Sequence, residues 1–322
     1  MRYDLNNARE LAIRVCVAAG ASKAVATSLA EAAVAAECSG RSGVGFAHLP
    51  DYLEGFLSGR IAATEEPDLL FPTPNIVQAD AKGGIAQLCF DRAFEELLSR
   101  TKTYGVTIFS LKNSYTVGEL GYYVRWLARE GLVAFASTNG PALMAAGQSA
   151  EAVYGTNPLA FAAPVENRPP LVFDQASSAT AFVNIRQVAE RGEEIPEGWA
   201  IDERGQSTLD PREAMKGALL NFGGTRGANI ALMVEILAAG TTGANWSLDA
   251  PSFEEGSESP GAGLFIVTIN PELLSPGFSK RLASQIERLS SKGIHIPGGS
   301  YQTDDIEIPS SLVATLESYL IK

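Results

Sequence analysis

Three short segments of the 322-residue chain combine polar residues in patterns that suit catalysis or ligand binding. The first segment spans residues 41–52, RSGVGFAHLPDY, where glycines loosen a loop that leads into a proline-started helix. This loop places His48 at the turn, and the chain has only one other histidine, His295. Because an imidazole changes its charge near neutral pH, His48 is the first candidate for acid–base chemistry.

The other two segments combine a carboxylate, small hydroxylated residues and a cation. Residues 155–164 read GTNPLAFAAP, and Asp174 follows at the end of an apolar run, just before residues 175–178, QASS, which end in two small hydroxylated side chains. Residues 222–227, FGGTRG, predict a glycine-rich turn in which Arg226 opens a buried helix. A cation at the amino end of a helix suits an anion such as a phosphate.

The composition excludes several classes of protein. Catalytic zinc sites commonly take two or three histidines, and neither H-x-x-x-H nor C-x-x-C spacing occurs here, so we expect no metal site. A Ser–His or Cys–His nucleophile would have to use His48 or His295. The 37 acidic residues outnumber the 25 basic ones, and the net charge of −12 opposes non-specific binding to nucleic acid.

The distribution of apolar residues and cysteines predicts the location of the protein. The first ten residues are polar, and no apolar stretch approaches the roughly 20 residues that cross a bilayer, so we expect no membrane partner. The three cysteines, Cys16, Cys38 and Cys89, are odd in number and widely spaced, which does not suggest a disulfide framework. We therefore expect a reduced, cytoplasmic protein.

The elements that must position the three segments follow from apolar periodicity and helix-end signals. Asp4 and Ser22 are predicted to cap the first two helices, and Gly59 to end the third. Helices are predicted at residues 4–19, 22–40, 49–58, 85–104, 117–129, 230–239, 279–291 and 310–320, and strands at 76–79, 106–111, 132–137, 159–163, 171–173 and 264–269. Residues 249–263, rich in Ser, Glu, Pro and Gly, predict a surface loop.

This order predicts an α/β protein with a strand-rich middle, residues 71–271, and helical ends, residues 1–70 and 272–322, that pack together as a second domain. A Rossmann domain is not expected, because it needs G-x-G-x-x-G between a strand and a helix. Neither of the G-x-G sequences, at residues 43–45 and 261–263, has that context, and the P-loop pattern is absent. A nucleotide would have to be held in another way.

Together the three segments resemble the malate/L-lactate dehydrogenase family of the non-Rossmann type, in order and over nearly the whole chain. Residues 155–164 give a ten-residue match. Within that family, residues 155–243 are most similar to the Δ1-piperideine-2-carboxylate/Δ1-pyrroline-2-carboxylate reductases, through F-A-A-P, F-D-x-A-[ST]-S, I-P-E-G, F-G-G and M-V-E-[IL]-L-A-A. The resemblance implies a homodimeric NAD(P)H-dependent oxidoreductase. It also implies a mainly antiparallel mixed sheet that binds an extended cofactor, with the active site between the domains near the dimer interface.

The chain departs from the family pattern at the positions of two histidines. The family's loop reads S-H-G-V-x-R-L-P, so Val44 stands where the family has its proton-donor histidine and His48 where it has a substrate-binding arginine. The family's N-S-x-H becomes residues 113–116 with Thr116 at its end, and H-K-G becomes residues 225–227. Reduction of a ketone forms an alkoxide that needs a proton donor, whereas a cyclic imine is basic enough to arrive protonated. The loop therefore favours an imine substrate over a ketone.

The resemblance and these changes imply a role for each candidate residue. His48 is expected to donate a proton or to anchor the substrate carboxylate. Asp174, which matches the family's catalytic aspartate, is expected to orient a donor or to stabilise the iminium, and Ser42 to hydrogen-bond in the catalytic loop. Tyr52 and Thr156 are expected to bind the substrate. The cofactor, NADPH or NADH, is expected to contact Asn113, Ser114, Tyr115, Thr116, Val117, Gly118, Gln175, Ala176, Ser177, Ser178, Arg226 and Gly299.

Three functions follow as hypotheses. The leading one is reduction of a small anionic cyclic imine, Δ1-pyrroline-2-carboxylate or Δ1-piperideine-2-carboxylate, to L-proline or L-pipecolate. The second is an NAD(P)-dependent 2-hydroxy-acid dehydrogenase of the malate, lactate or sulfolactate type, and the missing S-H-G counts against it. The third is a family member that has lost catalysis and binds a ligand. Structural roles are the alternative at single positions, where His48 would only cap its helix and Arg226 would only face solvent.

Overall fold

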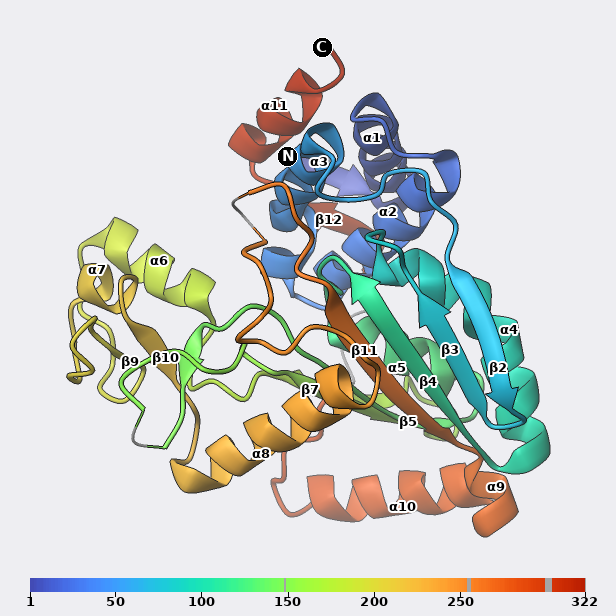
Figure 1. Ribbon diagram of the computed structural model, residues 1–322. Coiled ribbons are helices and arrows are strands. Elements are labelled where there is room, and N and C mark those ends of the chain that lie inside the picture. Colours follow the sequence, from blue (N-terminus) through green and yellow to red (C-terminus); the bar gives the residue numbers. More distant parts are fainter. Residues whose placement is uncertain (148, 254–255, 299–302, 322) are drawn as a thin grey trace.

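The computed structural model describes residues 1–147, 149–253, 256–298 and 303–321 (Figure 1). Its elements run in the order β1 (Arg2–Asp4), α1 (Leu5–Ala18), α2 (Lys23–Cys38), the 3-10 turns η1 (Ser42–Val44) and η2 (Phe46–His48), α3 (Leu49–Ser58), β2 (Asp68–Thr73), β3 (Ile76–Asp80), α4 (Ala86–Tyr104), β4 (Val106–Ser114), α5 (Leu120–Arg129), β5 (Val133–Thr138), β6 (Met144–Ala145), β7 (Leu159–Ala163), β8 (Leu171–Gln175), α6 (Phe182–Arg191), β9 (Ala200–Ile201), α7 (Pro211–Ala214), β10 (Ala218–Leu220), α8 (Thr225–Glu235), the π-helical turn η3 (Ile236–Gly240), β11 (Ala262–Ile269), α9 (Pro271–Leu274), α10 (Phe278–Ser290), β12 (Asp305–Glu307) and α11 (Ser310–Ser318).

A seven-stranded sheet forms the centre of the molecule, in the order β2-β3-β4-β11-β5-β7-β8. Only the β3–β4 pair is parallel, and the other five pairs are antiparallel. The predicted fold class, an α/β protein with a mainly antiparallel mixed sheet, is therefore confirmed.

Helices cover both faces of this sheet because its strands alternate in side-chain direction. On β11, the fully buried Leu264 and Ile266 pack into the core shared with α4 and α5. Gly263 faces the other side, where a Cβ atom would lie only 1.8 Å from the carbonyl oxygen of Ala238 in η3. The close approach of η3 to the sheet explains why this strand position carries a glycine.

A second core lies among α1, α2, α3 and α11. The two ends of the chain meet there, since β1 pairs with β12 and the amino-terminal amine donates to the carbonyl oxygen of Ile308 at 2.6 Å. Helix α10 lies apart from this cluster, at the bottom of Figure 1, and its Phe278 and Leu282 border a pocket with sheet residues.

The domain boundaries at residues 70/71 and 271/272 stay a prediction. No described helix is long and apolar enough to cross a membrane.

The predicted helix caps are confirmed. The Asp4 carboxylate accepts from the backbone N–H groups of Asn6 and Asn7, and the Ser22 hydroxyl accepts from Val25 N–H. These contacts satisfy donors that a helix start leaves free. Helix α5 starts at Leu120, three residues later than predicted, because Gly118 has a left-handed backbone, with φ of 70°.

The sequence interpretation missed some elements and misjudged one loop. Helix α6 and the edge strand β2 were not predicted, and residues 262–263 belong to β11 and not to the predicted loop. Within the described part of that loop, Phe253 lies against His48, with the two ring centroids 6.5 Å apart. The loop is therefore part of the packing around His48.

The candidate site segments gather at one edge of the sheet, the edge that is formed by strand ends and not by an outer strand. The antiparallel register pairs Ala262 with Ser114, Leu264 with Thr138, and Leu159 with both Ser137 and Gln175. The segments after β4, β5 and β8, and those before β7 and β11, therefore all leave the sheet at the same edge. Antiparallel topology thus brings together residues that are far apart in the sequence.

Candidate active site

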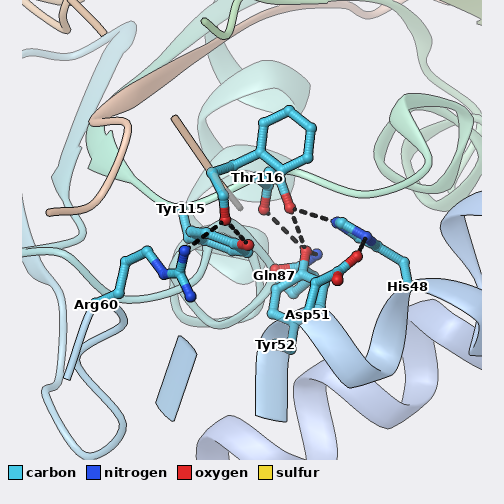
Figure 2. A network of polar contacts seen from close by, with 8 residues as sticks. His48, Asp51, Tyr52, Arg60, Gln87, Tyr115 and Thr116 are labelled. Atoms are coloured by element: carbon cyan, nitrogen blue, oxygen red, sulfur yellow. Dashed lines mark hydrogen bonds and ion pairs between the residues drawn. The ribbon is translucent and has the colours of Figure 1, made fainter. Parts of the chain in front are cut away.

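His48 lies at the start of α3 and hydrogen-bonds through both nitrogens of its ring (Figure 2). Its Nδ1 lies 2.7 Å from Asp51 Oδ2, and its Nε2 lies 3.0 Å from Thr116 Oγ1. Thr116 belongs to the segment after β4, so the imidazole joins the helical cluster to the edge of the sheet. The side chain of His48 is 14% exposed, which leaves one part of the ring open to solvent.

Tyr52, one residue beyond Asp51, makes a second link to the same segment. Its hydroxyl donates to the carbonyl oxygen of Thr116 at 3.0 Å and accepts from Thr116 Oγ1 and from Gln87 Nε2. Burial raises the pKa of Tyr52 to about 12, so the side chain stays a neutral phenol at physiological pH. Gln87 also donates to the carbonyl oxygen of Val117, which fixes the turn at Gly118.

Phe253, in the segment before β11, also contacts His48. Its carbonyl oxygen accepts from Tyr115 Oη at 2.8 Å and from Arg60 Nη1 at 3.2 Å, and both donors are buried. Its ring meets the ring of His48 edge to face. Arg60 and Tyr115 therefore fix the backbone of Phe253 where its ring contacts the imidazole.

Asp174 lies near the end of β8 and faces the start of α5. Its Oδ2 accepts from the backbone N–H of Gly121 at 2.8 Å, and its carbonyl oxygen accepts from Arg41 Nη2 at 2.6 Å. Burial raises the pKa of the Asp174 carboxyl, while the hydrogen bond from Gly121 and the charges of Arg41 and Arg125 oppose that shift. The residue borders a groove of about 1500 Å³ between α2, α5, β8 and residues 295–298.

The loop of residues 41–48 connects these two places. Its first residue, Arg41, contacts Asp174, and its last residue, His48, contacts Thr116. His48 and Asp174 themselves share no hydrogen bond or ion pair in the described part of the chain. Ser42 is exposed in η1 between them, and Val44 is 39% exposed. The structure therefore places the predicted catalytic residues on one loop and its neighbouring strand, without joining them directly.

Thr156 lies in a turn that a buried carboxylate supports. The carbonyl oxygen of Thr156 accepts from Ser177 N–H at 2.8 Å, and the carbonyl oxygen of Asn157 accepts from Ser177 Oγ. Asn157 is fully buried with φ of 38°, and its amide donates to Glu235 Oε2 at 2.8 Å. Glu235 also accepts from the N–H and the hydroxyl of Ser247. This network fixes the turn in which Thr156 lies, and the Thr156 side chain is half-buried.

The predicted cofactor residues near α8 lie together. The backbone N–H of Phe222 donates to the carbonyl oxygen of Ser177 at 3.0 Å, and Ser178 forms a bridge with Asn221. Arg226 is exposed in the first turn of α8. Gly223 and Gly224 precede it, each with positive φ and with open space where a Cβ atom would be. An open helix start with an exposed arginine fits an anionic group such as a phosphate.

Most of the other predicted cofactor residues already have structural partners. Asn113 donates to Asp80 Oδ1, the Ser114 hydroxyl to the carbonyl oxygen of Tyr115, and the Ser178 hydroxyl to the carbonyl oxygen of Thr180. Val117 is buried, Gln175 is exposed and Ala176 is half-buried. Gly299 lies outside the described residues.

Sequence reasoning missed several residues that surround these places. Asp51 stands three residues after His48, but an acid in the first turn of a helix is common and gave no separate signal. Gln87 and Glu235 are polar residues within apolar helical runs, a pattern that signals a buried polar contact. Arg60 and Phe253 carried no signal, because their contact depends on the folded path of a distant loop.

Comparison with known proteins identifies relatives of this chain. The family model described as malate/L-lactate dehydrogenase matches residues 3–304. The (2R)-3-sulfolactate dehydrogenase (NADP(+)) of Chromohalobacter salexigens is 33% identical over 99% of this chain and 98% of its own. The Δ1-pyrroline-2-carboxylate/Δ1-piperideine-2-carboxylate reductase of Pseudomonas putida is 34% identical over 87% of this chain and 83% of its own. The crystal structure of the Δ1-piperideine-2-carboxylate reductase of Pseudomonas syringae pv. tomato covers 99% of both chains, with a TM-score of 0.94 and 30% identity.

The raised pKa of Asp174 predicts a pH-dependent effect on stability. The folded state binds this proton more tightly than the unfolded state, so the free energy of unfolding falls as pH rises from about 3.9, the usual aspartate value, through the raised pKa. Asp174→Asn removes this loss and keeps an acceptor for Gly121 N–H. We expect urea unfolding to show the variant gaining stability relative to the wild type between about pH 4 and about pH 7.

The exposed Glu197→Gln is the matched control, and its stability difference should stay flat over the same range. A constant difference for Asp174→Asn, or one that changes in the opposite direction, would contradict the assigned effect of burial.

Proposed function

The chain belongs to the malate/L-lactate dehydrogenase family, and from that membership we propose that it is an NAD(P)H-dependent reductase of cyclic imines. The substrates are Δ1-pyrroline-2-carboxylate and Δ1-piperideine-2-carboxylate, and the products are L-proline and L-pipecolate. Relatives with these substrates in their names are 34% and 32% identical to this chain over 87% and 92% of its length.

One observation carries the choice of an imine. The resemblance places the proton donor of the family at position 44, where this chain has the exposed side chain of Val44, which holds no proton to give. The imidazole of the loop belongs to His48, four residues after Val44, and it contacts Thr116. A cyclic imine that arrives as an iminium is already an electrophile and forms no alkoxide, so it tolerates this change better than a ketone does.

The proposed substrate contacts lie around His48. The imidazole donates a proton or anchors the carboxylate, while the Thr156 hydroxyl and the region of Tyr52 complete the binding of this small anion. Asp174 and Ser42 act from the other end of the loop, where Asp174 orients a donor or stabilises the iminium cation. In a protein of net charge −12, such local donors must offset a general repulsion of anions.

The proposed cofactor, NADPH or NADH, supplies the hydride. The proposed cofactor residues lie in the segments that follow β4 and β8, which leave the sheet at the same edge, and in the first turn of α8. The bridge between Ser178 and Asn221 links the segment after β8 to the turn before α8. This arrangement suits a cofactor in an extended pose. Arg226 suits a phosphate, and the NADP(+) in the name of the Chromohalobacter salexigens relative supports NADPH.

The proposal includes a cytoplasmic homodimer. Exposed apolar side chains gather on α8, η3 and the segment that follows, namely Leu232, Met233, Ile236, Trp246 and Leu248. Exposed apolar patches of this kind mark interaction surfaces in soluble proteins. A second copy of the chain is the proposed partner for them.

The sulfolactate dehydrogenase relative favours a second candidate function, an NAD(P)-dependent 2-hydroxy-acid dehydrogenase. A substrate panel separates the two. We expect the purified protein to oxidise NADPH or NADH with the two cyclic imines and much more slowly with pyruvate, oxaloacetate or 3-sulfopyruvate, as followed by loss of the nicotinamide absorbance. Turnover of the keto acids alone would refute the imine proposal. Saturable binding of ligand without turnover would favour a non-catalytic family member.

A second experiment tests the role of His48. We expect His48→Ala to lower kcat/KM for the preferred substrate by about 100-fold, the usual order for loss of a general acid. Loss of a proton donor lowers kcat, whereas loss of a carboxylate anchor raises KM. His295→Ala, which removes the other, exposed histidine, is the control and should keep wild-type kinetics. Full activity of His48→Ala would show that its proposed role is wrong.

A further inference from the structure

The hydrogen bonds around His48 allow its protons to be counted. Tyr52 has one hydroxyl proton, and its Oη lies 3.0 Å from the carbonyl oxygen of Thr116, which can only accept. The phenol keeps this proton at neutral pH, because burial raises its pKa to about 12. The Tyr52 proton is therefore committed to the Thr116 carbonyl group.

The oxygen of Tyr52 must then accept from its other two neighbours. These are Gln87 Nε2 at 3.3 Å and Thr116 Oγ1 at 3.0 Å. Donation to Tyr52 uses the single hydroxyl proton of Thr116, so Thr116 Oγ1 can only accept in its contact with His48 Nε2 at 3.0 Å. His48 must therefore carry a proton on Nε2.

The other ring nitrogen faces a carboxylate. Nδ1 lies 2.7 Å from Asp51 Oδ2, an oxygen that accepts, so this nitrogen also carries a proton. A neutral imidazole would leave one of these contacts with two lone pairs and no proton between them. The contact is the one between Nδ1 and Asp51 when the ring proton is on Nε2, and the one at Nε2 or at the Tyr52 oxygen when the ring proton is on Nδ1. The full set of contacts is satisfied only by the imidazolium form of His48.

The charges near the ring favour the same form. Among the described residues, the titratable groups that contact His48 are Asp51 and Tyr52, both on α3, and the side chains that meet it from other elements are the non-titrating Thr116 and Phe253. Arg60 is also a cation and so disfavours an imidazolium at His48, but its hydrogen bond is to the carbonyl oxygen of Phe253 and not to the imidazole. The directly bonded carboxylate of Asp51 is the stronger influence because Coulomb energy falls with distance.

We propose that Asp51 is a positioning residue that holds His48 as an imidazolium, with the Nε2 proton directed toward Thr116. A charged ring serves either role open to His48, because an imidazolium can give up a proton and binds a carboxylate more strongly than a neutral ring does. What the cation does rests on the proposed function. In that reaction the imine carbon gains a hydride from the reduced nicotinamide, and the imine nitrogen carries a proton that it brings as an iminium or takes from His48. When His48 supplies the proton, the Nε2–H bond breaks, the Thr116 hydroxyl turns from the Tyr52 oxygen to donate to Nε2, and solvent reprotonates the partly exposed ring.

Nitrogen-15 spectra of the imidazoles test this proposal directly, because the chain has only two histidines. A free imidazole is about nine-tenths neutral at about pH 7.5. At that pH we expect His48, assigned with His48→Gln, to give the imidazolium pattern in the wild type and the neutral pattern in Asp51→Asn. Glu54→Gln is the matched control on the same helix, because Glu54 contacts Tyr319 and not His48, and it should leave the imidazolium pattern intact.

Kinetics give a second readout. We expect Asp51→Asn to lower kcat/KM by about tenfold or more and Asp51→Glu to restore part of the loss, while Glu54→Gln stays at the wild-type value. A neutral His48 in the wild type, or an unchanged His48 spectrum in Asp51→Asn, would overturn the proposal even if Asp51 matters for folding. If the spectra behave as expected but the wild type reduces no cyclic imine, the proposed function fails and the assignment of Asp51 stands.

Discussion

The contact of α3 with the segment after β4 is the constraint on which the rest of the site depends. His48 and Tyr52, one turn of helix apart, both bond to Thr116, so one residue at the edge of the sheet receives the side chains of the helical cluster. This contact sets where the loop of residues 41–48 ends, and the opposite end of the loop is set by Arg41 on the Asp174 carbonyl group. Phe253 then covers the imidazole because Arg60 and Tyr115 fix its carbonyl oxygen.

The sheet can support such a site because antiparallel register brings many connections to one edge. Segments that follow β4 and β8, and the turn before β7, supply Thr116, Ser177 and Thr156. Each of these segments contains buried polar groups that need partners, since an unpaired buried donor or acceptor is costly. Glu235 and Gln87 provide those partners from helices on either side of the sheet, and thereby fix the turns that present the candidate functional residues.

Local signals predicted much of the fold and part of the site. Asp4 and Ser22 bind the free N–H groups of their own helices, so a few neighbouring residues decide where those helices begin. Strand β2 was missed because it is an almost wholly exposed edge strand, without the apolar alternation that reveals a half-buried one. His48 stood out by its rarity, whereas its contacts with Thr116 and Phe253 depend on tertiary packing that no local pattern records.

In the proposed reaction, an anionic substrate meets a charged His48 held by Asp51 and Thr116. A crystal structure with the oxidised cofactor and pyrrole-2-carboxylate, a flat analogue of the five-membered cyclic imine, would show whether it does. We expect the ring or carboxylate of the analogue to lie within hydrogen-bond distance of His48 Nε2, with the cofactor extending from Arg226 toward Thr116. An analogue bound beside Asp174 in the large groove, with His48 bonded only to protein, would contradict it.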